Sequence, residues 1–212
     1  MARGRFITFE GGEGAGKSTQ ITRLGDALRA RGIDAVTTRE PGGSPGAEEI
    51  RELLLSGDIL RWDAMTEALL HFAARRDHLV RTIWPALDHG RWVLCDRFAD
   101  STMAYQGYAQ TLGRETVEAL YRLVVGDFVP DLTIIIDVPP RVGLKRVDER
   151  KLDETRYERM KPDFHARLRE AYQDIARRDP ARCVLIDGTK EIGAVSQAIQ
   201  DAVAARLGLD QG

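Results

Sequence analysis

One segment near the N-terminus limits the possible folds more than any other, the glycine-rich loop GGEGAGKS that begins at Gly11. It fills the pattern G-x-x-x-x-G-K-[ST] and stands between a strand-like run, RFITFE, and a helical pattern, STQITRLGDALRA. Glycines let backbone N–H groups converge on an anion without Cβ clashes, and the start of the next helix adds partial positive charge. The loop therefore predicts a nucleoside triphosphate site at the carboxyl end of a strand that leads into a helix.

The residues that close the loop have separate expected tasks. Lys17 is expected to reach the β- and γ-phosphates, and the Ser18 hydroxyl is expected to ligate Mg²⁺. A glycine-rich turn with a chance lysine is the alternative, and the four-position match in this context disfavours it. The predicted ATP-binding residues of the loop are Gly11, Gly12, Glu13, Gly14, Ala15, Gly16, Lys17, Ser18 and Thr19.

The rest of the chain alternates between strand-like and helical patterns. The strand-like runs are continuously apolar and rich in β-branched residues, which is typical of strands buried on both faces of a parallel sheet. The alternation predicts a three-layer α/β fold with a five-stranded parallel sheet and helices on both faces. The predicted strands are 5–10, 35–39, 92–98, 132–138 and 183–188. The predicted helices are 18–30, 63–88 with a kink or break near Pro85, 114–125, 140–150, 154–178 and 192–207.

Size and composition favour one domain in the cytoplasm. The 212 residues show no second core, so residues 1–212 are expected to form a single domain, with a short lid excursion at about 146–158. The net charge of -2 argues against nucleic acid or anionic membrane as a partner, and no apolar run approaches the ~18 residues of a membrane span. Cys95 and Cys183 lie in apolar runs, which suits buried thiols in a reducing compartment.

Several classes of nucleotide-binding protein are disfavoured. The chain contains no asparagine, so it cannot carry the Asn-Lys-x-Asp loop with which GTPases read guanine. A large motor ATPase would need a longer chain, whereas a small phosphotransferase fits. Such an enzyme needs a pocket for an acceptor anion, a group that helps the metal, and positive charge around the γ-phosphate.

Asp96 and Arg97 end the third predicted strand, at the sheet edge where ligands bind in open α/β folds. Asp96 is expected to hold Mg²⁺ directly or through water, and Arg97 to grip a phosphate oxygen with its planar fork. The alternative is a strand-end salt bridge.

Three further stretches are candidates for the acceptor side and the lid. TREPGGSPG (38–46) follows the second strand and is expected to form a pocket wall or, alternatively, a surface turn. In LLHFAARRDH, helical spacing puts His71, Phe72 and Arg75 near one face, where a ring and a guanidinium could bind a base and a phosphate; the alternative is a core Phe72. The charged run 141–170 is either a solvated helix face or the source of lid arginines.

Taken together, these stretches resemble the thymidylate kinases, which phosphorylate dTMP to dTDP with ATP. The resemblance runs from FEGGEGAGKST through TREPGG and CDRFADSTMAYQGY to LIDG, and DRF-x-x-S-x-x-AYQ is its most specific part. It implies a nucleoside monophosphate kinase domain of the phosphate-loop type that uses ATP, dTMP and Mg²⁺. The γ-phosphoryl group of ATP would be transferred in line to dTMP, for dTTP synthesis. The resemblance also implies a homodimer. Trp62, Leu79 and Trp84 are candidates for an apolar dimer face or, alternatively, core residues.

The resemblance also implies roles for individual residues. Arg75 resembles the arginine that holds the dTMP phosphate, Tyr105 one that crowds the ribose 2′ position, and either His71 or Phe72 would stack on thymine. The dTMP-binding residues implied are Glu40, Pro41, His71, Phe72, Arg75, Arg97, Ser101, Thr102, Tyr105 and Gln106. The catalytic residues implied are Glu13, Lys17, Arg97 and the lid arginines Arg150 and Arg156, with Arg146 as a further lid candidate. Arg146 and the loop at 187–190 are the candidates for adenine contacts.

Two other functions stay open. A deoxynucleoside kinase would share the scaffold, but its neutral hydroxyl acceptor needs a general base, and two arginines aimed at an acceptor phosphate would be unexplained. An ATP-dependent switch or assembly protein would hydrolyse ATP slowly and bind no nucleotide acceptor.

Overall fold

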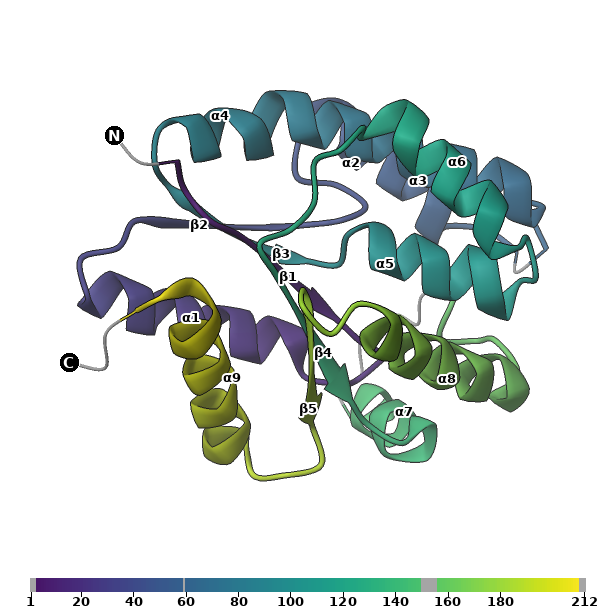
Figure 1. The fold of residues 1–212 in the computed structure, drawn as a ribbon. Helices are drawn as coiled ribbons and strands as arrows, with labels where there is room; N and C mark the ends of the chain where they lie inside the picture. The colour runs from purple at the N-terminus through teal and green to yellow at the C-terminus, as the bar shows by residue number, and fades with distance from the viewer. Residues whose placement is uncertain (1–2, 59, 150–155, 210–212) are drawn as a thin grey trace.

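A five-stranded parallel sheet forms the centre of the computed structural model, which describes residues 3–58, 60–149 and 156–209 (Figure 1). The strand order is β2-β3-β1-β4-β5, so the predicted α/β fold with a five-stranded parallel sheet is confirmed. The strands are β1 (Phe6–Glu10), β2 (Ala35–Arg39), β3 (Trp92–Asp96), β4 (Leu132–Asp137) and β5 (Cys183–Asp187). Phe9 pairs with Asp96 and Glu10 with Ile135, so the carboxyl ends of β1, β3 and β4 meet at one edge of the sheet.

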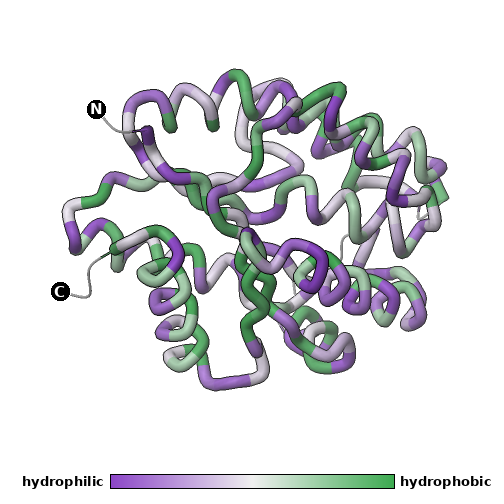
Figure 2. Tube along the Cα trace, viewed as in Figure 1, coloured by the Kyte–Doolittle hydropathy of each residue, from purple (hydrophilic) through white to green (hydrophobic). Residues whose placement is uncertain are grey.

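The sheet separates two apolar cores. Along β1 the side chains alternate, so that Phe6 packs into one core and Ile7 and Phe9 into the other. Because both faces are covered, all of β1 is buried, and Figure 2 shows hydrophobic residues concentrated along the central strands. The smaller core lies under α1 (Lys17–Ala30) and α9 (Ile192–Leu207).

The remaining helices cover the opposite face or the carboxyl edge (Figure 1). They are α2 (Pro45–Leu55), α3 (Ala64–His78), α4 (Trp84–Asp88), α5 (Ala99–Thr102), α6 (Arg114–Val124), α7 (Pro140–Asp148) and α8 (Pro162–Arg178), with π-helical turns η1 (Leu79–Ile83) and η2 (Met103–Ala109). Within the described ranges, no helix is long and apolar enough to cross a bilayer.

The helix predicted over 63–88 is confirmed as α3, η1 and α4, which together run from Ala64 to Asp88, and the irregularity expected near Pro85 is the π-helical turn η1, which ends at Ile83. Another predicted bound was wrong. The helix predicted over 154–178 begins only at Pro162, because proline favours the first helical turn and disfavours a helical residue before it. The structure adds α2 and the segment 99–109, which sequence reasoning missed.

Candidate active site

The glycine-rich loop joins β1 to α1 and wraps around the amino group of Lys17. The Lys17 Nζ lies 3.3 Å from the Gly11 carbonyl oxygen and 3.2 Å from that of Gly12, and its side chain is buried. Burial, together with the nearby Arg97, lowers the pKa of Lys17. The loop residues from Glu13 to Thr19 line an open hollow, as expected of a phosphate site.

Close packing requires glycine within the loop. Gly14 has a φ of +66°, and a Cβ there would stand 2.0 Å from the carbonyl oxygen of Gly143 in α7. A Cβ on Gly143 would in turn stand 2.2 Å from the Glu13 carbonyl oxygen. The two glycines therefore let α7, which leads toward the predicted lid, touch the phosphate loop.

Ser18 and Asp96 form a pair of oxygen donors at the foot of this hollow. The Ser18 hydroxyl donates to Asp96 Oδ2 over 3.1 Å, while the buried Asp96 Oδ1 has no hydrogen-bond partner among the described residues. The described part of the chain contains no cluster of three histidine, cysteine or acidic residues that could enclose a metal. One hydroxyl and one carboxylate oxygen fit Mg²⁺, which takes few protein oxygens and completes its shell with phosphate and water.

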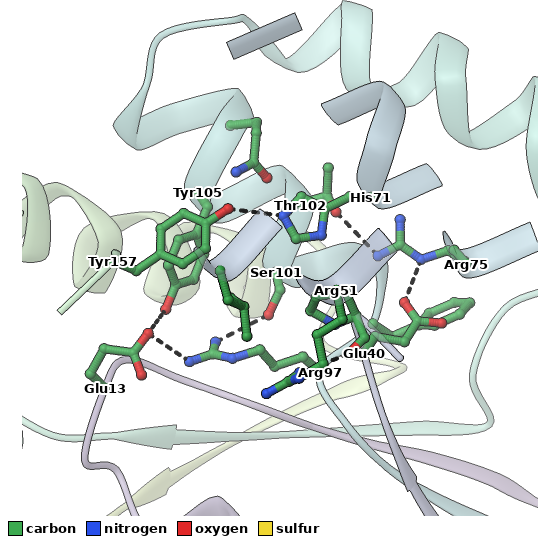
Figure 3. Close-up of a pocket in the computed structure, with 14 residues that line it drawn as sticks. Glu13, Glu40, Arg51, His71, Arg75, Arg97, Ser101, Thr102, Tyr105 and Tyr157 are labelled. Carbon is green, nitrogen blue, oxygen red and sulfur yellow. Dashed lines mark hydrogen bonds and ion pairs between the residues drawn. The ribbon is translucent and has the colours of Figure 1, made fainter. Parts of the chain in front are cut away.

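A second pocket adjoins the hollow on the side of α3 and α5 (Figure 3). Both pockets share a wall that is made of Glu13, Glu40, Arg51 and Arg97. The second pocket, called here the acceptor pocket, is lined by Glu13, Glu40, Pro41, Arg51, Leu55, His71, Arg75, Arg97, Phe98, Ser101, Thr102, Tyr105, Gln106 and Tyr157. An anion on the phosphate loop and a second anion in the acceptor pocket would meet at this wall.

Arg97 occupies the wall in a strained backbone conformation. Its φ is +69°, which is rare for a residue other than glycine, and strain of this kind clusters at functional sites. The guanidinium donates to the Gly11 carbonyl oxygen at 3.0 Å, to Ser101 Oγ at 3.2 Å and to Glu13 Oε1 at 3.1 Å. The left-handed turn ends β3 at Asp96 and aims the side chain back over the phosphate loop, as Figure 3 shows.

Glu13 provides a carboxylate at the same junction. Tyr105 donates its hydroxyl to Glu13 Oε1 over 2.6 Å, beside the contact from Arg97 (Figure 3). Burial alone would raise the pKa of Glu13, but Arg97 and Lys17 hold it below its usual value. Glu13 is therefore ionised at neutral pH and fixes both Arg97 and the aromatic ring of Tyr105.

Arg75 is held at the far end of the acceptor pocket with one donor nitrogen unused. Its Nε donates to Glu40 Oε2 over 2.8 Å and one Nη donates to Thr102 Oγ1 over 3.1 Å. The other, Nη1, is buried without a hydrogen-bond partner in the described ranges. A buried unpaired donor is costly, so the site favours an anion that would accept from it.

The structure separates His71 from Phe72. Phe72 is 1% exposed and packs in the larger core, which corrects its prediction as a pocket residue: one step along α3 turns it away from the acceptor pocket. His71 lines the pocket, and its Nε2 lies 3.0 Å from the Tyr157 hydroxyl (Figure 3). Burial and the arginines Arg75 and Arg156 lower the pKa of His71 to about 3, so the ring is neutral and can lie against a base.

The predicted lid arginines have different locations. Arg156 is 0% exposed and forms a buried ion pair with Glu67 of α3, so it faces the core rather than the phosphate loop, which corrects its prediction as a catalytic lid residue. The physical reason is that Glu67 supplies a buried carboxylate partner. Arg146 donates from both terminal nitrogens to the Gly188 carbonyl oxygen at 3.3 Å, which joins the two regions predicted to contact adenine. Arg150 lies outside the described residues.

Sequence reasoning missed several residues of the acceptor pocket, above all Arg51 and Tyr157. Arg51 lies on the unpredicted helix α2, lines both pockets and donates to the Pro41 carbonyl oxygen over 2.7 Å. Tyr157 directly follows Arg156, lines the acceptor pocket and donates its own hydroxyl to Glu67 Oε1 over 2.7 Å. Arg51 belongs to no local motif and Tyr157 stands beside a predicted lid arginine, so only packing identifies both as pocket residues.

Glu10, at the end of β1, supports the segment that carries Arg97. It is fully buried and accepts from the Phe98 backbone N–H at 2.7 Å, from Ser101 Oγ at 2.6 Å and from the Tyr172 hydroxyl at 3.1 Å. Burial first, and the nearby Asp100 second, raise the pKa of Glu10 to about 7.

We expect Glu10→Gln to change how stability depends on pH. The folded pKa of about 7 exceeds the ordinary value of 4.5, so the stabilising contribution is complete below pH 4.5 and is lost as the pH rises through 7. Relative to wild type, the variant should gain up to about 3 kcal/mol in free energy of unfolding between pH 5 and pH 9. Urea unfolding at several pH values measures this, with the exposed Glu49→Gln as control; equal pH slopes in wild type and Glu10→Gln would contradict it.

Comparison with known proteins gives one consistent family. Residues 9–199 match the family model described as thymidylate kinase. The chain is 56% identical over 209 residues to a thymidylate kinase of Caulobacter vibrioides, which covers 99% of this chain and 100% of that protein. It is 53% identical over 207 residues to one from Bradyrhizobium sp., covering 97% and 92% of the two chains. The crystal structure of thymidylate kinase from Ehrlichia chaffeensis superposes with a TM-score of 0.77 at 35% identity, covering 95% of this chain and 99% of that one.

Proposed function

The chain belongs to the thymidylate kinase family, and from this premise we propose that its two adjoining pockets hold ATP and dTMP end to end. The protein phosphorylates dTMP to dTDP with ATP, a step in dTTP synthesis. The observation that carries the assignment of the pockets is their shared wall of Glu13, Glu40, Arg51 and Arg97. A γ-phosphoryl donor on one side and an acceptor phosphate on the other would face each other across these side chains.

Each of the main residues of the site has a proposed role. Lys17 neutralises the β- and γ-phosphates, and Arg97 screens the repulsion between the donor and acceptor phosphates. Arg75 binds the acceptor phosphate through its unused Nη1, while the neutral His71 lies against the thymine ring. Tyr105, fixed by Glu13, excludes a ribose 2′ hydroxyl because that group would be buried without a partner.

The reaction requires little covalent chemistry from the protein. The acceptor is already an anion, so no general base is needed, and transfer proceeds when an acceptor phosphate oxygen lies in line with the γ-phosphorus. The chain supplies alignment and positive charge through Lys17 and Arg97. Arg150 keeps its predicted role as a lid arginine, within a single domain that spans residues 1–212.

Nucleotide assays test the proposed function. The protein is incubated with ATP, Mg²⁺ and each nucleoside monophosphate in turn, and the diphosphates formed are separated by chromatography. We expect dTDP as the main product. A parallel reaction with thymidine distinguishes a thymidylate kinase from a deoxynucleoside kinase. Phosphorylation of thymidine in preference to dTMP would contradict the proposed function. ATP hydrolysis without any phosphorylated acceptor would indicate a switch protein.

We propose Mg²⁺ as the metal, held by Ser18 and Asp96 together with the ATP phosphates. The unpartnered Asp96 Oδ1 supports this assignment. When bound, the ion would neutralise phosphate charge. Asp96→Asn, which replaces one anionic oxygen donor by an amide, should raise the Mg²⁺ concentration for half-maximal activity by about tenfold. A magnesium titration of the variant measures this, with Asp26→Asn on the exposed side of α1 as control; an unchanged midpoint would contradict the assignment.

We also propose a homodimer located in the cytoplasm. The helices α2, α3 and α6 pack together and expose the apolar residues Leu53, Met65, Leu69 and Leu123, the last of which is 82% exposed. Of the candidates for this face, Leu79 is instead fully buried in the core. Sedimentation velocity tests the proposal, since a monomer at micromolar concentration would contradict it.

Cys95 and Cys183 are both free and buried, which suits the reducing cytoplasm, and cell fractionation would test this location.

A further inference from the structure

Glu67 of α3 is a buried carboxylate that accepts hydrogen bonds from two separate parts of the chain, residues 106–110 and 156–157. It is 0% exposed and forms an ion pair with Arg156 through Oε2. Its Oε1 accepts from Gln106 Nε2 at 2.6 Å, Gln110 Nε2 at 2.8 Å and the Tyr157 hydroxyl at 2.7 Å. The direct chemistry of phosphoryl transfer gives no role to this group, yet two of its partners, Gln106 and Tyr157, line the acceptor pocket.

The charge of Glu67 dictates which way the Gln106 carboxamide faces. An amide side chain can present either its oxygen or its nitrogen to a neighbour, but a carboxylate paired with a guanidinium can only accept hydrogen bonds. The Gln106 NH₂ group must therefore point at Glu67. Its Oε1 is left buried without a hydrogen-bond partner in the described part of the chain, and Gln106 lines the acceptor pocket, so the oxygen is the carboxamide atom that Glu67 leaves unengaged.

We propose that Glu67 is a specificity-determining positioning residue, which locks the Gln106 carboxamide so that only its oxygen can face the acceptor base. This inference rests on the proposed function of the pocket. Thymine carries an N–H at N3 and can donate to this oxygen. Cytosine carries an unprotonated N3, which would place two acceptors against each other and leave both unpaired. Glu67 thereby selects imide bases without touching the substrate.

The test replaces Glu67 by glutamine, which has the same shape but can both donate and accept. The Gln106 carboxamide is then free to turn, and its NH₂ group can face cytosine N3. We expect the ratio of kcat/KM for dTMP to that for dCMP to fall at least about tenfold in Glu67→Gln. The ratio for dTMP to dUMP should stay unchanged, because uracil has the same N3–H edge. A purely structural loosening would lower activity toward all three nucleotides and leave both ratios intact.

Gln110 offers a matched control. It bonds to the same Glu67 oxygen but does not belong to the lining of the acceptor pocket, so Gln110→Leu should keep the wild-type ratios. Glu67→Gln leaves the Arg156 charge buried beside a neutral amide and can destabilise the fold. The double variant Glu67→Gln with Arg156→Met removes both charges and should show the same fall in the dTMP to dCMP ratio.

The outcomes separate this inference from the proposed function. If wild type prefers dTMP but a folded Glu67 variant keeps the full discrimination against dCMP, the positioning role is wrong and the function stands. If the wild-type protein phosphorylates dCMP as well as it phosphorylates dTMP, the acceptor pocket does not select thymine over cytosine, and the proposed preference for dTMP is wrong as well.

Discussion

Lys17→Ala should lower kcat by about 10²–10³ while leaving the fold intact, since one charge-stabilising donor contributes this much to a transition state. In the free protein the Lys17 amino group contacts only two backbone carbonyls of the loop, at 3.2 and 3.3 Å, within the described residues. Lys17 itself lines the open hollow, so water can enter where its side chain is removed. The loss should therefore appear in turnover rather than in stability.

Steady-state kinetics and thermal unfolding together measure this expectation. Lys145→Ala is a suitable control, because Lys145 lies on α7 with its side chain 77% exposed. The control should keep wild-type turnover. A folded Lys17→Ala protein that retained near wild-type turnover would show that the loop lysine has no part in the transfer.

Arg75→Ala should weaken dTMP binding by about 10- to 100-fold and leave ATP binding unchanged, because a hydrogen bond to a charged group contributes about 1.5–3 kcal/mol. Arg75 lines the acceptor pocket and is absent from the lining of the phosphate hollow. Its unused Nη1 is the donor that an acceptor phosphate would engage.

Calorimetric titration of each nucleotide separately measures the two affinities. Arg76→Ala is the matched control, because the neighbouring Arg76 points to the Val124 carbonyl oxygen of α6 and should leave both affinities unchanged. Arg75→Ala also removes the guanidinium that pairs with the buried Glu40, so Arg75→Lys, which keeps a cation there, guards against loss of folding. Equal losses of dTMP and ATP affinity would contradict the assignment of Arg75 to the acceptor.

Local patterns in the sequence were sufficient for the phosphate loop, the five strands and the family. Each depends on residues that are neighbours in the chain: glycines that admit an anion, continuous apolar runs that become buried strands, and DRF-x-x-S-x-x-AYQ behind one of them. The parallel sheet then followed, because strands joined by helices return in the same direction.

Tertiary packing alone decided which side chains face the acceptor pocket. His71 and Phe72 are adjacent and both aromatic, yet one lines the pocket and the other is core, since a helix turns by 100° per residue. Arg156 carries the charge expected of a lid but finds Glu67, 89 residues away in the chain. No local pattern encodes such a pair, because its energy depends on burial and on partners that only the folded chain brings together.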